Sequence, residues 1–282
     1  MPGSRPEHAP LAALIVDLSE AARRSHQRRV LLLAGGSVWC RREADAALQT
    51  IRPESPLWVG THAPAGVPST PAARASRHLG RECDALIFDA HEGFDPNAFG
   101  AVAGTLRGGG LLLLLSPPLP EWETFPDPEK ARIAVHPFAA EGVSGRFLRR
   151  LAHVAHASPG VTVVTEGEAI PDIAEDKVAH SLPPDCAAPP HPARRAAPWV
   201  HACRTPDQAA AVEAIVHTAT GHRRRPTVLI SDRGRRNSSA LGTAAAPLLR
   251  QGAHRIPVTA PRPEASAAVL AQAAPPLPPS ES

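Results

Sequence analysis

Residues 84–115 read DALIFDAHEGFDPNAFGAVAGTLRGGGLLLLL, and this stretch decides the fold class. An apolar run at 84–89 is followed by a polar loop, a helical pattern at 96–106, three glycines and a second apolar run at 111–115. Both apolar runs are short and uninterrupted, which is typical of strands buried on both faces. Strand, helix and strand in this order predict a parallel sheet that is covered by helices.

The same alternation extends to both sides of this stretch. Apolar residues recur at helical spacing in three further segments, and two further apolar runs have the length of buried strands. The expected elements are helices at 11–25, 43–50 and 145–157 and strands at 29–34 and 56–60. The sequence therefore predicts an α/β protein whose N-terminal domain, residues 1–160, is a three-layer parallel-sheet fold.

A second, smaller unit is expected after a proline-rich linker at 161–204, where six prolines fall between residues 183 and 198. This unit, 205–273, is expected to be α/β as well, and Pro247 should kink or end its second helix early. The tail 274–282 has the composition of a disordered segment. Its expected elements are helices at 207–219, from 239 toward Arg250 and at 264–273, with strands at 227–230 and 255–260.

Composition limits the class of protein only in part. The 282 residues carry a net charge of +3, and their thirty basic residues include only two lysines. Arginine suits contacts with phosphate or nucleic acid, but a GC-rich genome produces the same bias. Four cysteines without CxxC spacing predict neither a zinc site nor a disulfide framework. With no signal peptide pattern and no long apolar segment, we expect a cytoplasmic protein without a membrane partner.

A basic, glycine-containing loop at 231–238, SDRGRRNS, lies between an expected strand and an expected helix. This is the setting of a phosphate-binding P-loop, which ends in Gly-Lys-Ser. Here the three places hold Arg236, Asn237 and Ser238. The glycine, which has no side chain, and the lysine ammonium group are therefore lost, while the hydroxyl that binds Mg²⁺ is kept. Loss of the lysine alone should weaken nucleotide binding about tenfold to a hundredfold. The alternative interpretation is an ordinary basic turn.

Four acidic and imidazole side chains follow the strand at 84–89: Asp89, His91, Glu92 and Asp95. They are candidates for a metal or acid–base site, because α/β proteins place such sites after the strands. The favoured interpretation is a polar loop in which Asp95 caps the helix that begins at Pro96. Gly35 and Gly36, after the strand at 29–34, are interpreted as a tight turn because no GxGxxG pattern follows.

Short motifs spread over residues 10–273 share their order and spacing with one known family. They are 29–35 with Trp39-Cys40, HLGRE at 78–82, FDAHEGFD at 88–95, AF at 98–99, GTL at 104–106, EWE at 121–123, TPDQ at 205–208 and VTAP at 258–261. Together they resemble the bacterial tRNA(Met) cytidine acetyltransferase family. That family uses acetyl-CoA and ATP to make N4-acetylcytidine at the wobble position of elongator tRNA(Met).

The resemblance implies the domain composition of that family, which has an N-terminal α/β domain, a helicase-like (RecA-like) P-loop ATPase domain, an acetyltransferase domain and a tRNA-binding region. TPDQ resembles the glutamine motif of the ATPase domain. The resemblance therefore implies that nucleotide contacts Gln208, Gly234, Arg235, Arg236, Asn237, Ser238 and Ser239, with Ser238 as a weak Mg²⁺ ligand.

The sequence departs from the family at Arg236 and Asn237 and stops soon after the VTAP motif. We therefore expect a truncated, degenerate ATPase domain at 205–273, weakened ATP and Mg²⁺ binding, no acetyl-CoA site and no acetyl transfer by the chain alone. tRNA is an expected partner, and a separate chain would supply the missing domains. The alternatives are a non-catalytic RNA- or protein-binding module formed by 1–160 and a small active NTPase, so enzymatic activity stays open.

Overall fold

The computed structural model describes residues 8–171, 203, 205–221, 226–230, 237–253, 255–260 and 263–273. The chain divides into two compact units, Met1–Ser181 and Leu182–Ser282. Each unit is considered by itself.

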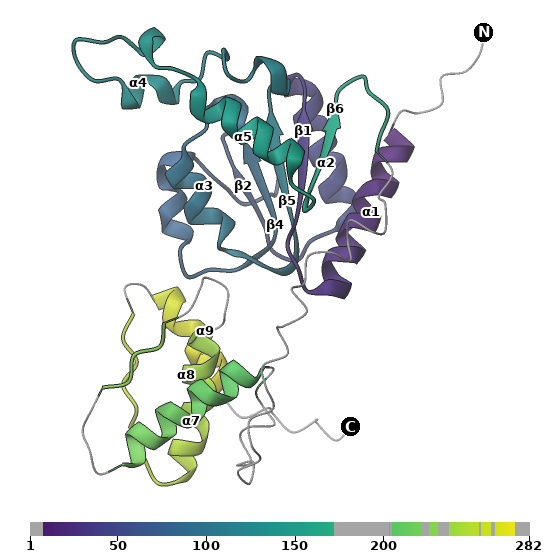
Figure 1. Ribbon diagram of the computed structural model, residues 1–282. Helices are drawn as coiled ribbons and strands as arrows, with labels where there is room; N and C mark the ends of the chain where they lie inside the picture. Colours follow the sequence, from purple (N-terminus) through teal and green to yellow (C-terminus); the bar gives the residue numbers. More distant parts are fainter. Residues whose placement is uncertain are drawn as a thin grey trace. The chain divides into compact units, whose positions relative to one another are not determined.

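The first unit is built on one six-stranded sheet whose strands are all parallel, in the order β3-β2-β4-β5-β1-β6 (Figure 1). The strands are β1 Arg29–Ala34, β2 Pro56–Val59, β3 Ser69–Thr70, β4 Cys83–Asp89, β5 Leu106–Ser116 and β6 Val161–Thr165. The predicted α/β fold with a parallel sheet is confirmed. The sequence did not predict β3 and β6, and β6 lies in the stretch that it assigns to the linker.

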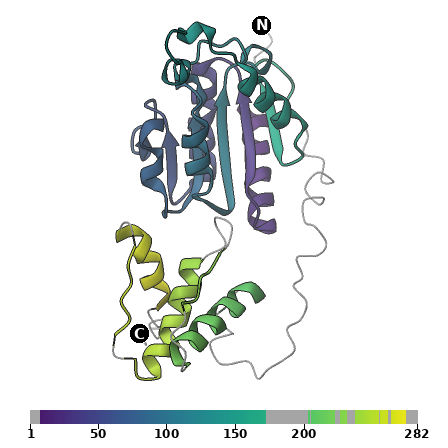
Figure 2. The same ribbon diagram turned by 60° about the vertical axis from the view of Figure 1, so that its left-hand side comes forward.

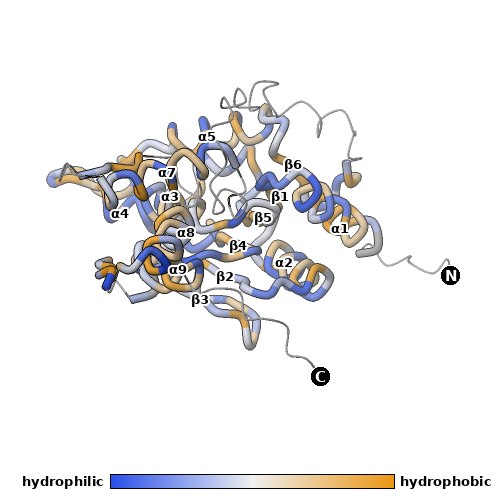
Figure 3. Tube along the Cα trace, turned by 90° about the horizontal axis from the view of Figure 1, so that it is seen from below, coloured by the Kyte–Doolittle hydropathy of each residue, from blue (hydrophilic) through white to orange (hydrophobic). Residues whose placement is uncertain are grey.

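Helices cover both faces of this sheet, which gives the three layers (Figures 2 and 3). Leu31 and Leu33 pack in a core under α1 and α2, while Leu32 and Ala34 pack in a second core with α3 and α5. Because alternate residues of β1 enter different cores, the strand is apolar throughout. The helices are α1 His8–Ser25, α2 Ser37–Ile51, α3 Pro96–Ala103, α4 Glu129–Ile133 and α5 Arg146–Ala157, with 3₁₀ turns η1 Ala72–His78, η2 Ala90–Glu92, η3 Leu119–Glu121 and η4 Ala140–Gly142.

Two element boundaries differ from those expected. Helix α2 begins at Ser37, directly after the glycine pair, instead of at residue 43. Helix α3 ends at Ala103, and the three glycines at 108–110 lie inside β5. The strand starts at Leu106 because this residue pairs with Cys83 before a register shift. A Cβ at Gly110 would lie 2.8 Å from the Asp84 carbonyl oxygen, so this glycine permits close strand packing.

The described part of the second unit contains three helices, α7 Pro206–Thr220, α8 Asn237–Arg250 and α9 Pro263–Ala273, where helices were expected. Pro247 does not end α8 early, because the helix continues to Arg250, and the other predicted outcome, a kink at Pro247, stays a prediction. Pro247 lies one turn from the helix end, and the next residue, Leu248, packs on the small core of Val212, Val216, Ala240 and Ala244. This packing offsets the missing backbone hydrogen bond.

The two strands expected in the second unit are not formed in its described segments, 226–230 and 255–260. Val228 is 75% exposed and Ile230 is 92% exposed, so this apolar run is not buried in a sheet of the described segments. The prolines at 183–198 and the tail 274–282 lie outside the described residues. No described helix combines the length and apolar character needed to cross a bilayer.

Candidate functional site

The carboxyl ends of the parallel strands meet at one edge of the first unit, and polar residues gather there. β1 is followed by Gly35, β4 ends at Asp89, and β6 is followed by Glu166. Open parallel sheets bind their ligands at this edge. The site therefore has the expected position, and what it can bind depends on how its charges are already paired.

Arg41, on α2, neutralises the buried carboxylate at the end of β4. Its Nε donates a hydrogen bond of 2.7 Å to Asp89 Oδ2, and the Asp89 side chain is 0% exposed. The Arg41 Nη2 lies 3.8 Å from Glu92 Oε1. The other carboxylate oxygen of Asp89 accepts from the backbone N–H of His91 at 3.1 Å, which caps η2. Both carboxylate oxygens of Asp89 thus accept hydrogen bonds from the protein itself.

Glu92 holds the loop that follows β2. Its carboxylate accepts from the Thr61 backbone N–H at 2.8 and 3.0 Å and lies 2.8 Å from His62 Nδ1. Burial alone raises the pKa of Glu92, but the hydrogen bonds from His62 and Thr61 outweigh it, so the pKa lies below its ordinary value of 4.5. The carboxylate is therefore charged at neutral pH.

One group of His62, Asp89 and Glu92 has the composition of a metal site, with ligand atoms within 4.8 Å of one another. The guanidinium of Arg41 already supplies the positive charge that these carboxylates need. The geometry thus favours an internal ion-pair network over a metal centre.

Asp95 takes no part in this network. Its Oδ1 accepts from the Asn97 backbone N–H at 2.9 Å, which confirms the predicted cap of α3, and lies 3.1 Å from an Arg132 nitrogen. Of the four predicted loop residues, Asp89 and Glu92 are brought together through Arg41. Asp95 is turned toward Arg132.

The start of α2 is occupied by a carboxylate from the chain itself. The Gly36 backbone N–H donates to Glu166 Oε2 at 2.7 Å. A Cβ at Gly35 would lie 2.6 Å from Glu166 Cβ, so the glycine permits the contact. Helix N-termini attract anions, and Glu166 takes the place that a phosphate would occupy. The interpretation of the glycine pair as a turn is supported, and the sequence did not predict its partner.

Next to this contact lies a cavity of about 290 Å³. Its polar lining includes Ser37, Arg41 and His91. Burial lowers the pKa of His91 below its ordinary 6.5, and Arg41 adds to this effect against the opposing influence of Asp89. The ring Nε2 is buried without a hydrogen-bond partner in the described part of the chain. The cavity thus offers a neutral imidazole to a small polar ligand, because the Arg41 guanidinium is already paired with Asp89 and Glu92.

In the second unit, two of the predicted nucleotide-contacting residues meet. Gln208, in the first turn of α7, donates from Nε2 to Ser239 Oγ of α8 at 3.2 Å. The N-cap Thr205 accepts from the Gln208 backbone N–H at 3.2 Å and fixes the start of α7. The sequence positions assigned to one nucleotide site are therefore adjacent at this point.

The remaining predicted residues of that site are described only in part. Asn237 and Ser238 form the start of α8, and Ser238 is half-buried. Gly234, Arg235 and Arg236 lie outside the described residues. The loop conformation and the Mg²⁺ role of Ser238 stay predictions.

The sequence did not point to Arg41, His62 or Glu166 as site residues. Each reaches the edge from a different element, so no local motif joins them. A signal was present for Glu166, because the alternating run at 161–165 that precedes it has the pattern of a strand.

The fold and the polar carboxyl edge of the sheet define a three-layer α/β protein of the parallel-sheet class. The same chain carries a second unit, in which Gln208 is hydrogen-bonded to Ser239. Comparison with known proteins narrows this class. The family model described as "tRNA(Met) cytidine acetyltransferase TmcA, N-terminal" matches residues 10–166, and "RNA cytidine acetyltransferase NAT10/TcmA, helicase domain" matches 228–278. The chain belongs to the tRNA(Met) cytidine acetyltransferase family.

Curated relatives carry the same name. The tRNA(Met) cytidine acetyltransferase TmcA of Nitrosococcus halophilus is 45% identical over 88% of this chain and 32% of its own length. Those of Haloarcula marismortui and Vibrio cholerae are 34% and 29% identical over 91% and 88% of this chain, and over 33% and 29% of their own lengths. The chain spans about a third of the length of these relatives.

Proposed function

We propose that these residues form the N-terminal domain and the opening of the helicase-like domain of a tRNA(Met) cytidine acetyltransferase. The proposed division is an N-terminal domain at 1–160, a linker at 161–204, a degenerate ATPase segment at 205–273 and a tail at 274–282. The observation that carries the proposal is the order of the two family matches, 10–166 followed by 228–278.

Within this proposal, the 282 residues bind tRNA and do not transfer an acetyl group by themselves. The two matched regions are an N-terminal domain and a helicase domain, and neither is an acetyltransferase domain. Formation of N4-acetylcytidine from acetyl-CoA and ATP in the cytoplasm would then depend on residues supplied elsewhere. Mass spectrometry of tRNA(Met) incubated with the chain, acetyl-CoA and ATP tests this point, and N4-acetylcytidine formed by the chain alone would contradict it.

tRNA binding is tested by a gel shift with a tRNA(Met) transcript at several salt concentrations. Affinity should fall steeply with salt, because arginine contacts to phosphates release condensed counterions. A protein-binding module, the second candidate, predicts no tRNA complex at any salt concentration.

ATP binding is proposed to be weak, because Arg236 and Asn237 stand where a P-loop has glycine and lysine. The double variant Arg236→Gly with Asn237→Lys restores both groups. Calorimetric titration should show ATP binding about tenfold to a hundredfold tighter in this variant, the value of one charge-assisted contact.

A substitution at Gln208 provides a second test of the restored ATP site. Gln208→Ala in the restored background should weaken ATP binding again, because Gln208 lies beside the start of α8. Tight, magnesium-dependent ATP turnover by the unmodified chain would refute the proposed degeneracy.

A further inference from the structure

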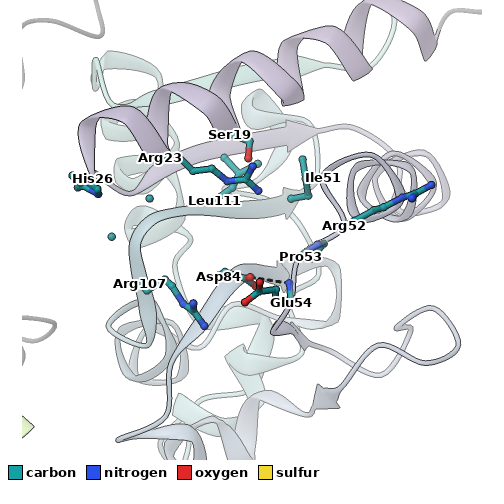
Figure 4. A pocket seen from close by; sticks show the side chains of 12 residues that line it. Ser19, Arg23, His26, Ile51, Arg52, Pro53, Glu54, Asp84, Arg107 and Leu111 are labelled. Atoms are coloured by element: carbon teal, nitrogen blue, oxygen red, sulfur yellow. Dashed lines mark hydrogen bonds between the residues drawn. The ribbon is translucent and has the colours of Figure 1, made fainter. Parts of the chain in front are cut away.

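A second cavity, of about 560 Å³, lies at the opposite edge of the first unit's sheet (Figure 4). It is bounded by the C-terminal ends of α1 and α2 and by the beginning of β5. The carboxyl-edge site described above is formed by the other ends of the same strands. The two cavities share no lining residue.

Four basic side chains from three elements surround this space: Arg23, His26, Arg52 and Arg107. We call these four residues the amino-edge basic surface. In Figure 4, His26 and Arg52 lie on opposite sides, with Arg23 between them and Arg107 below. No ion pair with a described carboxylate engages the three guanidinium groups. Three guanidinium groups and one imidazole thus line the same cavity.

The two acidic residues of the lining do not cancel this charge. Asp84 accepts from the backbone N–H groups of Glu54 and Ser55 at 2.8 and 2.9 Å, so its carboxylate holds the loop before β2. Three arginines against Asp84 and Glu54 leave one net positive charge, before any contribution from His26. Arg107 donates to Ser55 Oγ at 3.0 Å, while its Nε is buried without a partner among the described residues.

Two of the four residues occupy backbone positions that favour glycine. His26 has a φ of 52°, and Arg52 has φ 43° and ψ 63° at the C-cap of α2. Helices commonly end in this left-handed conformation with glycine, because a Cβ is strained there. Cations stabilise helix C-termini, so basic side chains suit these two ends even though the left-handed backbone favours glycine. They also place a cation at each side of the cavity.

We propose that the amino-edge basic surface binds the sugar-phosphate backbone of RNA. Several separate cations around one cavity suit a polyanion with more than one phosphate, and guanidinium groups match phosphate geometry. His26 is the one aromatic ring among the twelve lining residues, so the lining offers more cations than stacking surfaces. Contact is thus made through phosphates, independently of sequence. The inference rests on the proposed function and assigns part of its tRNA contact to these residues.

The test measures binding of a fluorescently labelled tRNA(Met) transcript to the full 282-residue chain by anisotropy at several salt concentrations. The variants are Arg23→Gln, Arg52→Gly and the two combined. Each single variant should weaken binding about threefold to tenfold at low salt and reduce the slope of log affinity against log salt by about one, and the combined variant should reduce the slope by about two.

Arg52→Gly separates binding from folding. It retains the backbone N–H that donates to the Leu48 carbonyl at 3.0 Å and relieves the left-handed strain. Its thermal midpoint should therefore equal or exceed that of the unmodified protein while RNA binding weakens. Arg150→Gln removes the same charge from exposed α5 and should change binding less than either variant.

The outcomes are distinguishable. If the unmodified chain binds tRNA and the combined variant binds with the same affinity and salt slope, the amino-edge assignment is wrong and the proposed function stands. An equal loss from Arg150→Gln would attribute the effect to net charge and also overturn the assignment. If the unmodified chain does not bind tRNA, the proposed tRNA contact fails, and this inference fails with it.

Discussion

At the scale of single residues, Arg41 holds the carboxyl edge of the sheet together. It supplies the only cation within ion-pair distance of Asp89 in the described chain, and the Asp89 side chain is fully buried. A buried carboxylate without a partner is costly, because its desolvation is no longer offset. The stability of the edge therefore depends on a residue that belongs to a different element, α2.

Arg41→Gln should lower the free energy of unfolding by about 2–3 kcal/mol, below the upper range for buried pairs because Arg41 is itself 23% exposed. Urea denaturation at pH 7 measures the loss. Arg24→Gln is the control, since its pair with Glu20 is exposed on both sides and should contribute less than about 1 kcal/mol. Equal losses from both variants would contradict the importance of Asp89 burial.

Glu92 should make stability depend on pH. Its folded pKa lies below the ordinary 4.5, so its carboxylate stabilises the fold above that pH, and this contribution is lost as pH falls through the lowered folded value. Glu92→Gln should be less stable than the unmodified protein at pH 7, with a difference that shrinks below about pH 4.5. Urea denaturation across this range provides the measurement. Glu168→Gln, an exposed substitution, is the control, and a difference for Glu92→Gln that is independent of pH would contradict the prediction.

At the scale of elements, helices were predictable where apolar periodicity and caps agree. Asp95 before Pro96 marked the start of α3, and α7 begins at Pro206, one residue before its expected start. The end of α3 was not predictable, because Leu106 begins β5 by pairing with Cys83 of another strand. The two-residue strand β3 is defined only by its pairing with β2, whereas the strand pattern of β6 at 161–165 was present in the sequence and was assigned to the linker.

The junction between η3 and α5 depends on Gly145. A Cβ there would lie 1.8 Å from the Glu123 carbonyl oxygen, and a backbone atom cannot move aside as a flexible side chain does. Gly145→Ala should therefore destabilise the first unit by about 1–3 kcal/mol, the range for overpacked sites. Gly142→Ala is matched to it, because nothing lies within 4 Å of its Cβ position. Thermal unfolding of the two variants should separate them clearly, and equal midpoints would contradict the predicted clash.

At the scale of the whole molecule, the two units differ in how much core they possess. The first unit has two apolar cores, one on each face of its sheet, while the described part of the second has one small core that includes Val212 and Ala244. Val228 and Ile230 of the same unit remain exposed. Fewer buried apolar contacts imply easier local opening.

Limited proteolysis should therefore cleave the second unit first. A protease of broad specificity should leave a fragment that retains the region from α1 to β6, because its strands and helices are packed on both faces. Mass spectrometry of the fragments identifies the cleavage positions. Equal resistance of residues beyond 200 would show that this unit is held by packing beyond its small core.

The sequence alone determined the α/β class, the positions of the main strands and the family, because these depend on local apolar patterns, caps and motif spacing. Only the tertiary structure decided the pairing of Arg41 with Asp89, the docking of Glu166 at α2 and the gathering of four basic residues at the amino edge. These arrangements join residues from distant parts of the chain. Their positions follow from the strand order, which no local pattern specifies.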